Sequence, residues 1–110
     1  MTNEYNITYS PESVDDLKRI YSYIAFDLSV PSTAENQINR IREKVGSLTF
    51  MPLRHTIVDW EPWRSMEMHQ ILVDKYIVYY MVNVNIFTVT IVRIVYSGMD
   101  VERFINLWEK

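Results

Sequence analysis

Length, composition and charge place this chain among small single domains and exclude several classes of protein. Its 110 residues include no cysteine, are 48% hydrophobic and carry a formal net charge of −3. A chain of this length is expected to form one domain over residues 1–110 and to fold without metals or disulfides. The missing cysteines favour a reducing cytosol. The acidic balance argues against a broad nucleic-acid-binding surface, which is normally basic.

Targeting signals and cofactor motifs are not recognisable in the sequence. The first residues show no basic segment followed by an apolar run, so no signal peptide is predicted. No stretch has the roughly 20 apolar residues of a membrane-spanning helix. Two glycines cannot supply a phosphate-binding loop or a nucleophile elbow. We therefore expect a cytoplasmic protein without a membrane anchor, a cofactor or a metal.

The first half of the chain predicts a strand followed by a helical hairpin. Residues 5–9 alternate between apolar and polar side chains, as strands do. Ser10 can cap a following helix, and Pro11 suits its first turn. The apolar stripe of that helix consists of Val14, Leu17, Ile20, Tyr21, Ile24 and Phe26. After an interruption at residues 29–32, a second helix ends near Pro52 and presents Ile38, Ile41, Val45 and Leu48.

The second half of the chain changes to a period of two residues. Strands are predicted at residues 55–58, 66–73, 76–82 and 86–96, and Asp100 can cap a helix over 101–108. The expected fold class is α+β in the order β-αα-βββ(-α), with an antiparallel sheet packed against the helical hairpin. Residues 76–82 do not alternate cleanly, so both faces of this strand should be shielded. The C-terminal helix, aromatic neighbours or another protein could cover the second face.

Four segments in this order resemble a known family. They are YNITYSPESVDDLKRIYSYI, AENQINRIREKVGSLTFMPLRH, HQILVDKYIVYYMV and VTIVRIVYSGMD. The chain is thereby similar to the RelE/ParE superfamily, the toxins of bacterial type II toxin–antitoxin systems. The resemblance implies a growth-inhibitory toxin that a cognate antitoxin neutralises, with gyrase or ribosome-bound mRNA as its target. It is also compatible with a homodimer.

Departures from the family pattern bear on the activity. The catalytic arginine of RNA-cleaving members falls on Tyr76, and another family arginine falls on His69. RNA cleavage needs a cation at the scissile phosphate and a base for the 2′-hydroxyl. Tyrosine cannot replace an arginine that binds phosphate through two N–H groups. The departures favour the ParE-like or plasmid-stabilisation branch and a gyrase-directed toxin. A ribosome-dependent mRNA endonuclease and a non-toxic relative that only binds a partner remain alternatives.

Three residues are candidates for catalysis if the protein cleaves RNA. Arg93 could bind a phosphate, or it could pair with a neighbouring carboxylate at a sheet edge. Tyr96 lies where relatives often place a histidine or tyrosine, but it could simply fill the end of the sheet. His69 could act as an acid or base near neutral pH.

Four residues are candidates for binding the antitoxin or the target: Trp60, Trp63, Arg64 and Tyr76. A tryptophan in a loop often anchors an interface, although each indole could instead cover the edge of the core. We expect a groove between the helical hairpin and the sheet to hold an antitoxin segment that folds on binding. The other face or an edge of the sheet is a further candidate docking surface.

Overall fold

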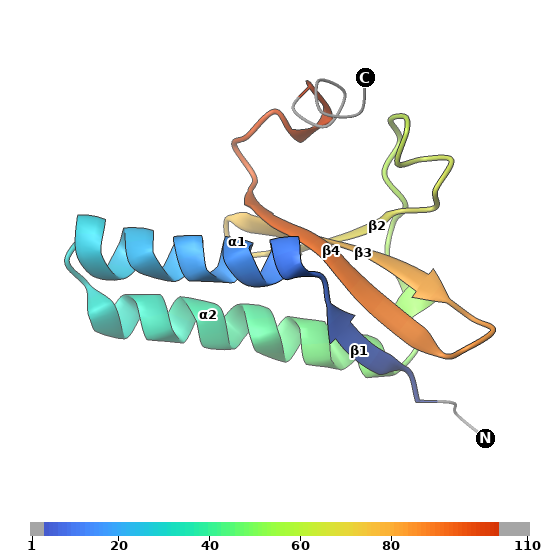
Figure 1. Ribbon diagram of the computed structural model, residues 1–110, viewed down its shortest axis with the longest axis horizontal. Coiled ribbons are helices and arrows are strands. Elements are labelled where there is room, and N and C mark those ends of the chain that lie inside the picture. Colours follow the sequence, from blue (N-terminus) through green and yellow to red (C-terminus); the bar gives the residue numbers. More distant parts are fainter. Residues whose placement is uncertain (1–3, 104–110) are drawn as a thin grey trace.

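A four-stranded sheet and a helical hairpin form the two layers of this computed structural model, which describes residues 4–103. Figure 1 shows the two long helices running side by side, with one end of the hairpin extending beyond the sheet. The elements in chain order are β1 (Asn6–Tyr9), α1 (Pro11–Ser22), a π-helical turn (Tyr23–Asp27), α2 (Pro31–Gly46), two short 3₁₀ turns (Ser47–Thr49 and Pro52–Arg54), β2 (His69–Val73), β3 (Tyr76–Asn83) and β4 (Thr88–Tyr96).

The sheet has the strand order β1-β4-β3-β2. Strands β2, β3 and β4 are antiparallel neighbours, as predicted. β1 differs from the prediction because it pairs with β4 in parallel, with Asn6 opposite Thr88 and Tyr9 opposite Ile91. Parallel neighbours need a long crossover connection, and the helical hairpin lies within the chain that separates these two strands. The sheet is therefore mixed rather than wholly antiparallel.

Three strand predictions included too many residues. Residues 55–58 form a single bridge between Ile57 and His69 instead of a strand. The strand expected from residue 66 begins at His69, because Glu67 adopts a left-handed φ of 56° that interrupts extended backbone. Phe87 has a φ of 48° and similarly delays the last strand to Thr88.

The expected C-terminal helix is described only at its start. Residues 101–103 are helical, and the Asp100 side chain accepts a hydrogen bond from the backbone N–H of Arg103 at 3.2 Å. This contact matches the predicted N-cap role of Asp100. Residues 104–108 of the prediction lie outside the described residues.

The main core lies between α2 and the sheet. The stripe predicted from the sequence supplies Ile41 and Val45 of α2 and Leu48 of the 3₁₀ turn that follows it, each at most 1% exposed. These side chains contact Val78 and Tyr80 of β3 in the same buried cluster. Burying a large aliphatic side chain contributes about 1.5–3 kcal/mol, so this contact stabilises the hairpin against the sheet.

The second face of the sheet is covered by the chain's own loop over residues 58–68. Val58, Trp63 and Met68 from this loop are buried with Tyr79 of β3, and Val101 at the start of the C-terminal helix belongs to the same cluster. The central strand is therefore shielded on both faces, as its sequence predicted. Aromatic neighbours supply much of the cover, which differs from the expectation that this face docks a partner.

Ser10, which precedes α1, forms hydrogen bonds with the part of β4 that extends beyond the end of β1. Ser10 caps α1 by accepting from the N–H of Ser13 at 3.0 Å, as predicted. Its own N–H donates to Ile91 O at 2.9 Å, and its hydroxyl donates to Val92 O at 2.8 Å. The β4 carbonyls that β1 leaves free are thereby paired, and α1 is fixed beside the sheet.

The β2–β3 turn is tied to α2. Asp74 has a φ of 54°, and its carboxylate accepts from Arg40 Nε at 2.7 Å and Gln37 Nε2 at 3.0 Å. The hydrogen bonds from Arg40 and then Gln37 lower the pKa of Asp74.

Within the described part of the chain, no helix has the length and apolar character needed to cross a membrane.

Candidate functional site

A groove of about 590 Å³ runs between α1 and the ends of β3 and β4. Arg19 and Tyr23 from the helical side and Lys75 from the β2–β3 turn contribute to its lining. The strands contribute three residues singled out in the sequence: Tyr76, Arg93 and Tyr96. The fold thus brings together side chains from distant parts of the chain. Asp16 and Arg93, which form a hydrogen bond in the groove, are 77 positions apart in the sequence.

Tyr76 and Tyr96 form an aromatic pair at one end of the groove. They are paired residues on β3 and β4, and their rings meet edge to face with centroids 6.2 Å apart. Burial raises the pKa of Tyr76, and the nearby Tyr23 and Tyr96 raise it further. The Tyr76 phenol is therefore neutral near pH 7 and cannot supply the charge of an arginine.

The turn after β4 sets the position of the Tyr96 ring. A methyl group added at Gly98 would lie 2.4 Å from Cε2 of Tyr96. Only a residue without Cβ allows the ring to rest against this turn. The contacts with Gly98 and Tyr76 therefore set the position of the Tyr96 ring. Because Tyr96 is 53% exposed, the rest of the ring remains accessible.

Arg93 is held by a buried carboxylate of α1. Its Nε and Nη2 donate to the two oxygens of Asp16 at 2.9 and 3.0 Å. Asp16 is 5% exposed and also accepts from the N–H of Ile94 at 2.9 Å. Arg19 adds a longer contact to the same carboxylate at 3.4 Å. This arrangement is the sheet-edge pairing that was the alternative for Arg93.

The ion pair explains why Arg93 lies among apolar neighbours. The hydrogen bonds to Asp16 raise the pKa of Arg93, against the opposing effect of burial. A two-point contact with a carboxylate uses the same N–H groups that would grip a phosphate. Arg93 is thus engaged in holding α1 against β4.

His69 lies outside the groove, beneath the loop that precedes β2. It is 4% exposed, its ring stacks on Tyr80 at 5.1 Å, and its Nδ1 lies 2.8 Å from the carbonyl oxygen of His55. The carbonyl can only accept, so Nδ1 carries the proton. The Tyr80 hydroxyl donates to Pro52 O at 2.6 Å. These contacts anchor residues 52–55 to the sheet.

The two loop tryptophans stack against the second face of the sheet. Trp63 is 3% exposed, and its ring lies 4.9 Å from Trp60 and 4.8 Å from Tyr79. The buried Trp63 therefore covers the core, which was the alternative to an interface role. Trp60 is half-buried and Arg64 is exposed, but both lie in the loop on the second face, outside the groove.

Sequence reasoning missed Asp16, which organises the groove. The residue lies between Ser13 and Ile20 on the inward face of α1. A carboxylate on such a face needs a partner when buried. Arg93, flanked by Val92 and Ile94, has the matching opposite charge. An acidic residue on the buried face of the helix and an arginine in an apolar strand could therefore have predicted this ion pair.

A family model described as "ParE toxin of type II toxin-antitoxin system, parDE" matches residues 7–101. The chain belongs to the ParE toxin family. The match runs from β1 to the residues after β4 and so includes every strand of the sheet, both long helices and the groove. The prediction of a toxin from a type II toxin–antitoxin system is confirmed, with the ParE branch now assigned. No curated protein matches the chain.

Two solved structures share the fold of this ParE family member. One is described as the chromosomal ParDE toxin–antitoxin system from P. aeruginosa; it has 15% identity and a TM-score of 0.70, covering 86% of this chain and 97% of that one. The other is the toxin–antitoxin complex RelBE2 from Mycobacterium tuberculosis, with 17% identity and a TM-score of 0.60, covering 84% and 91%. These likenesses confirm the predicted α+β fold.

Proposed function

We propose that this ParE family member inhibits bacterial growth by binding its target in the cytoplasm, and that the target is gyrase. A cognate antitoxin neutralises it. The observation that carries this proposal is the pairing of Arg93 with Asp16. This pairing engages the guanidinium of Arg93, the arginine that the sequence offered as a candidate for RNA cleavage.

The other catalytic candidates do not form a site for cleaving a phosphodiester. His69 is buried under a different part of the chain and bonded to a backbone carbonyl. Tyr76 is held neutral by burial, which raises its pKa. A cleavage site needs a cation at the phosphate together with a base, and neither His69 nor Tyr76 meets this need in the groove. Inhibition by binding requires no such pair.

The groove has the character of a peptide-binding surface. Tyrosines and aliphatic side chains line it, and Arg19 and Lys75 add positive charge. An amphipathic antitoxin segment that carries acidic residues would match this lining. The similar structures described as a ParDE system and a RelBE2 toxin–antitoxin complex support such a partner.

The activity is tested with two assays on the purified full-length protein. We expect inhibition of gyrase supercoiling and intact mRNA in a coupled translation reaction. Codon-phased cuts in ribosome-bound mRNA would refute the binding mechanism. Normal colony growth with abundant soluble protein and no antitoxin would instead identify a non-toxic binding partner.

The groove is tested separately by charge reversal. Lys75→Glu should weaken antitoxin binding, because it places a negative charge at the lining. Lys44→Glu is the matched control, since Lys44 is an exposed lysine of α2 that does not line the groove. Equal affinities for the two variants, measured by titration calorimetry, would show that the antitoxin binds elsewhere.

A further inference from the structure

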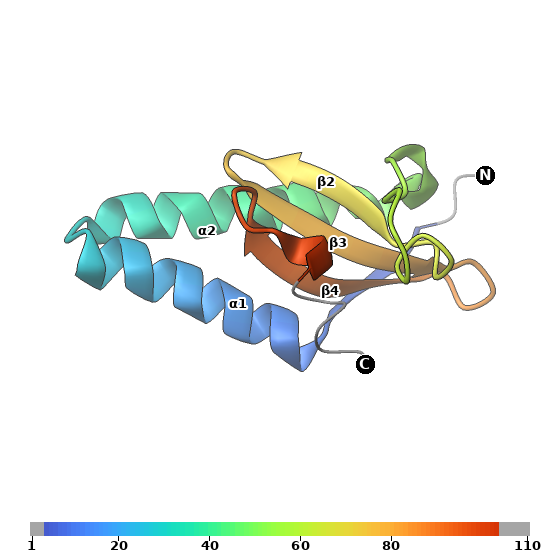
Figure 2. The ribbon, with the colours of Figure 1, turned by 90° about the horizontal axis from the view of Figure 1, so that it is seen from above.

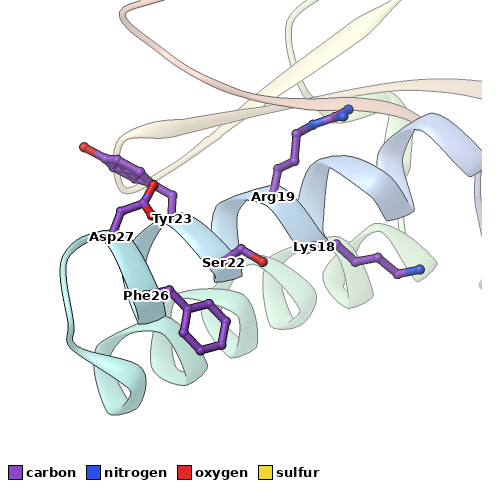
Figure 3. Close-up of a pocket in the computed structure, with 6 residues that line it drawn as sticks. All are labelled: Lys18, Arg19, Ser22, Tyr23, Phe26 and Asp27. Carbon is purple, nitrogen blue, oxygen red and sulfur yellow. The ribbon is translucent and has the colours of Figure 1, made fainter.

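The far end of α1 carries an exposed patch that the groove does not explain. Six residues line a shallow hollow of about 580 Å³ there: Lys18, Arg19, Ser22, Tyr23, Phe26 and Asp27. Figure 3 shows all six on one stretch of helix. Phe26 is 71% exposed and Tyr23 is 49% exposed, so two aromatic rings lie at the surface among charged side chains. We call these six residues the α1 patch.

The π-helical turn shapes the end of the patch. The N–H of Leu28 donates to Tyr23 O at 3.0 Å, which is the i→i+5 bond of a π-turn. Ile24 and Ala25 of this turn are buried against Ala34 of α2. Phe26 and Asp27 follow them on the outer side, so the hairpin core and the patch are presented by the same short turn.

The α1 patch consists of two rows with four-residue spacing. One row is Lys18, Ser22 and Phe26, and the other is Arg19, Tyr23 and Asp27. Residues four apart lie on one face of a helix, and Figure 3 shows the two rows pointing to different sides of the helical stretch. Each row begins with a cation. One row ends with an aromatic ring and the other with a carboxylate, both of which attract cations.

We propose that the α1 patch binds the α1 patch of a second copy of this chain, with the two helices antiparallel. A two-fold axis then passes beside Ser22 and Tyr23 and sets each row against the same row of the other copy in reverse order. Arg19 is 71% exposed and makes only the longer 3.4 Å contact with Asp16, so its guanidinium can turn outward to face Asp27 of the second copy. Lys18 faces Phe26. Every such contact occurs twice. The small Ser22 lies at the centre, where it allows close approach of the helices.

Charge complementarity selects a second copy as the occupant. The patch carries positive charge at one end and a carboxylate at the other, so its antiparallel copy places opposite charges in register. The reversed rows form two ion pairs and two cation–π contacts. The end of the hairpin also extends beyond the sheet, as Figures 1 and 2 show, and is therefore accessible to another molecule.

The contact is small and the dimer is correspondingly weak. A standard interface uses about 20–30 residues from each partner, whereas the α1 patch has six. We expect a dissociation constant on the order of 10–100 μM, corresponding to about 5.5–7 kcal/mol. Arg19 and Tyr23 also line the groove, so the second copy would contact its rim. The dimer does not depend on the target proposed above.

The dimer is tested by sedimentation of the purified full-length chain over a range of concentrations. The average mass should rise from 13.2 kDa toward twice that value. Arg19→Glu alone sets a second carboxylate against Asp27 of the other copy, and Asp27→Arg alone sets two guanidinium groups together. Each variant should raise the dissociation constant at least about tenfold. Phe26→Ala should weaken the dimer without changing any charge.

Mixing the two charge variants tests the register itself. In an equimolar mixture of Arg19→Glu and Asp27→Arg, unlike chains pair without the like-charge contacts that each variant makes with itself. Association should therefore be stronger in the mixture than in either variant alone. Lys44→Glu, outside the patch, should leave the dimer unchanged. Thermal unfolding of each variant confirms that it is folded.

Two outcomes would overturn the proposal. The first is a wild-type chain that stays monomeric at about 1 mM, well above the expected dissociation constant. If Asp27→Arg then also loses antitoxin binding, the patch belongs to the antitoxin. The second is a mixture that associates no better than the separate variants.

Discussion

Replacing Asp16 with asparagine should destabilise the protein strongly without creating a cavity. The substitution keeps an oxygen that can accept from the N–H of Ile94. It removes the negative charge that faces Arg93, whose side chain is only 16% exposed. A guanidinium without its carboxylate is then left largely out of water.

The expected loss of unfolding free energy follows from this burial. Removing one member of a buried ion pair costs about 3–5 kcal/mol. Arg93 keeps some access to solvent, so we expect about 2–4 kcal/mol for Asp16→Asn, out of a typical total of about 5–15 kcal/mol. For a domain of this size the corresponding fall in Tm is about 10–20 °C.

A double-mutant cycle with Arg93→Met measures the pair directly. Urea unfolding followed by circular dichroism should show a coupling of about 1–3 kcal/mol between the two sites. Losses that add within about 0.5 kcal/mol would contradict the account of the pair. The folded double variant should still arrest growth. A folded, soluble double variant without toxicity would show that the toxic activity needs the Asp16–Arg93 pair.

Three further predictions concern other parts of the molecule. Trp63→Ala should lower the unfolding free energy by about 3–5 kcal/mol, because it leaves a cavity where the indole packs against the second face of the sheet. Denaturant titration measures this change, and a loss under about 1 kcal/mol would argue against this role. Gly98→Ala should displace the Tyr96 ring and weaken partner binding, while an exposed turn keeps the change in stability within about 0.5 kcal/mol; calorimetric titration with the antitoxin checks it, and unchanged affinity would remove Tyr96 from the interface. The pKa of His55 is lowered by burial and then by the nearby Arg54, Lys44 and His69. Its contribution to stability is therefore complete above the unfolded pKa of about 6.5 and is lost as the pH falls from there through the lower folded pKa. Unfolding titrations at about pH 7.5 and pH 5.5 should show a loss that His55→Asn reduces, and an equal loss in the variant would assign it to other groups.

Local signals predicted the helical hairpin and the three consecutive antiparallel strands. Ser10 and Pro11 marked the start of α1, and the stripe of Ile41 and Val45 identified the buried face of α2. The turn at Asp74 was recognisable from its position between two apolar strands. Each of these features depends on residues close together in the chain, and therefore leaves a pattern that can be read from the sequence.

Contacts between distant segments left weaker signals. Parallel pairing of Asn6 with Thr88 has no local mark, and the alternation at residues 55–58 did not distinguish a strand from a single bridge. The role of Arg93 depended on Asp16, which precedes it by 77 positions. The sequence identified Arg93, Tyr76 and Tyr96 as candidates, but their common groove required the fold.

The pairing of the first strand with the last bears on how the toxin is made. During synthesis the residues of β1 and the helical hairpin emerge before their partners in β3 and β4 exist. The apolar stripe of α2 then has no sheet to cover until residues 76–96 have been added. Long-range contacts of this kind form late. A ribosome that stops before residue 96 therefore releases a chain without a finished groove, because Tyr76, Arg93 and Tyr96 all line it.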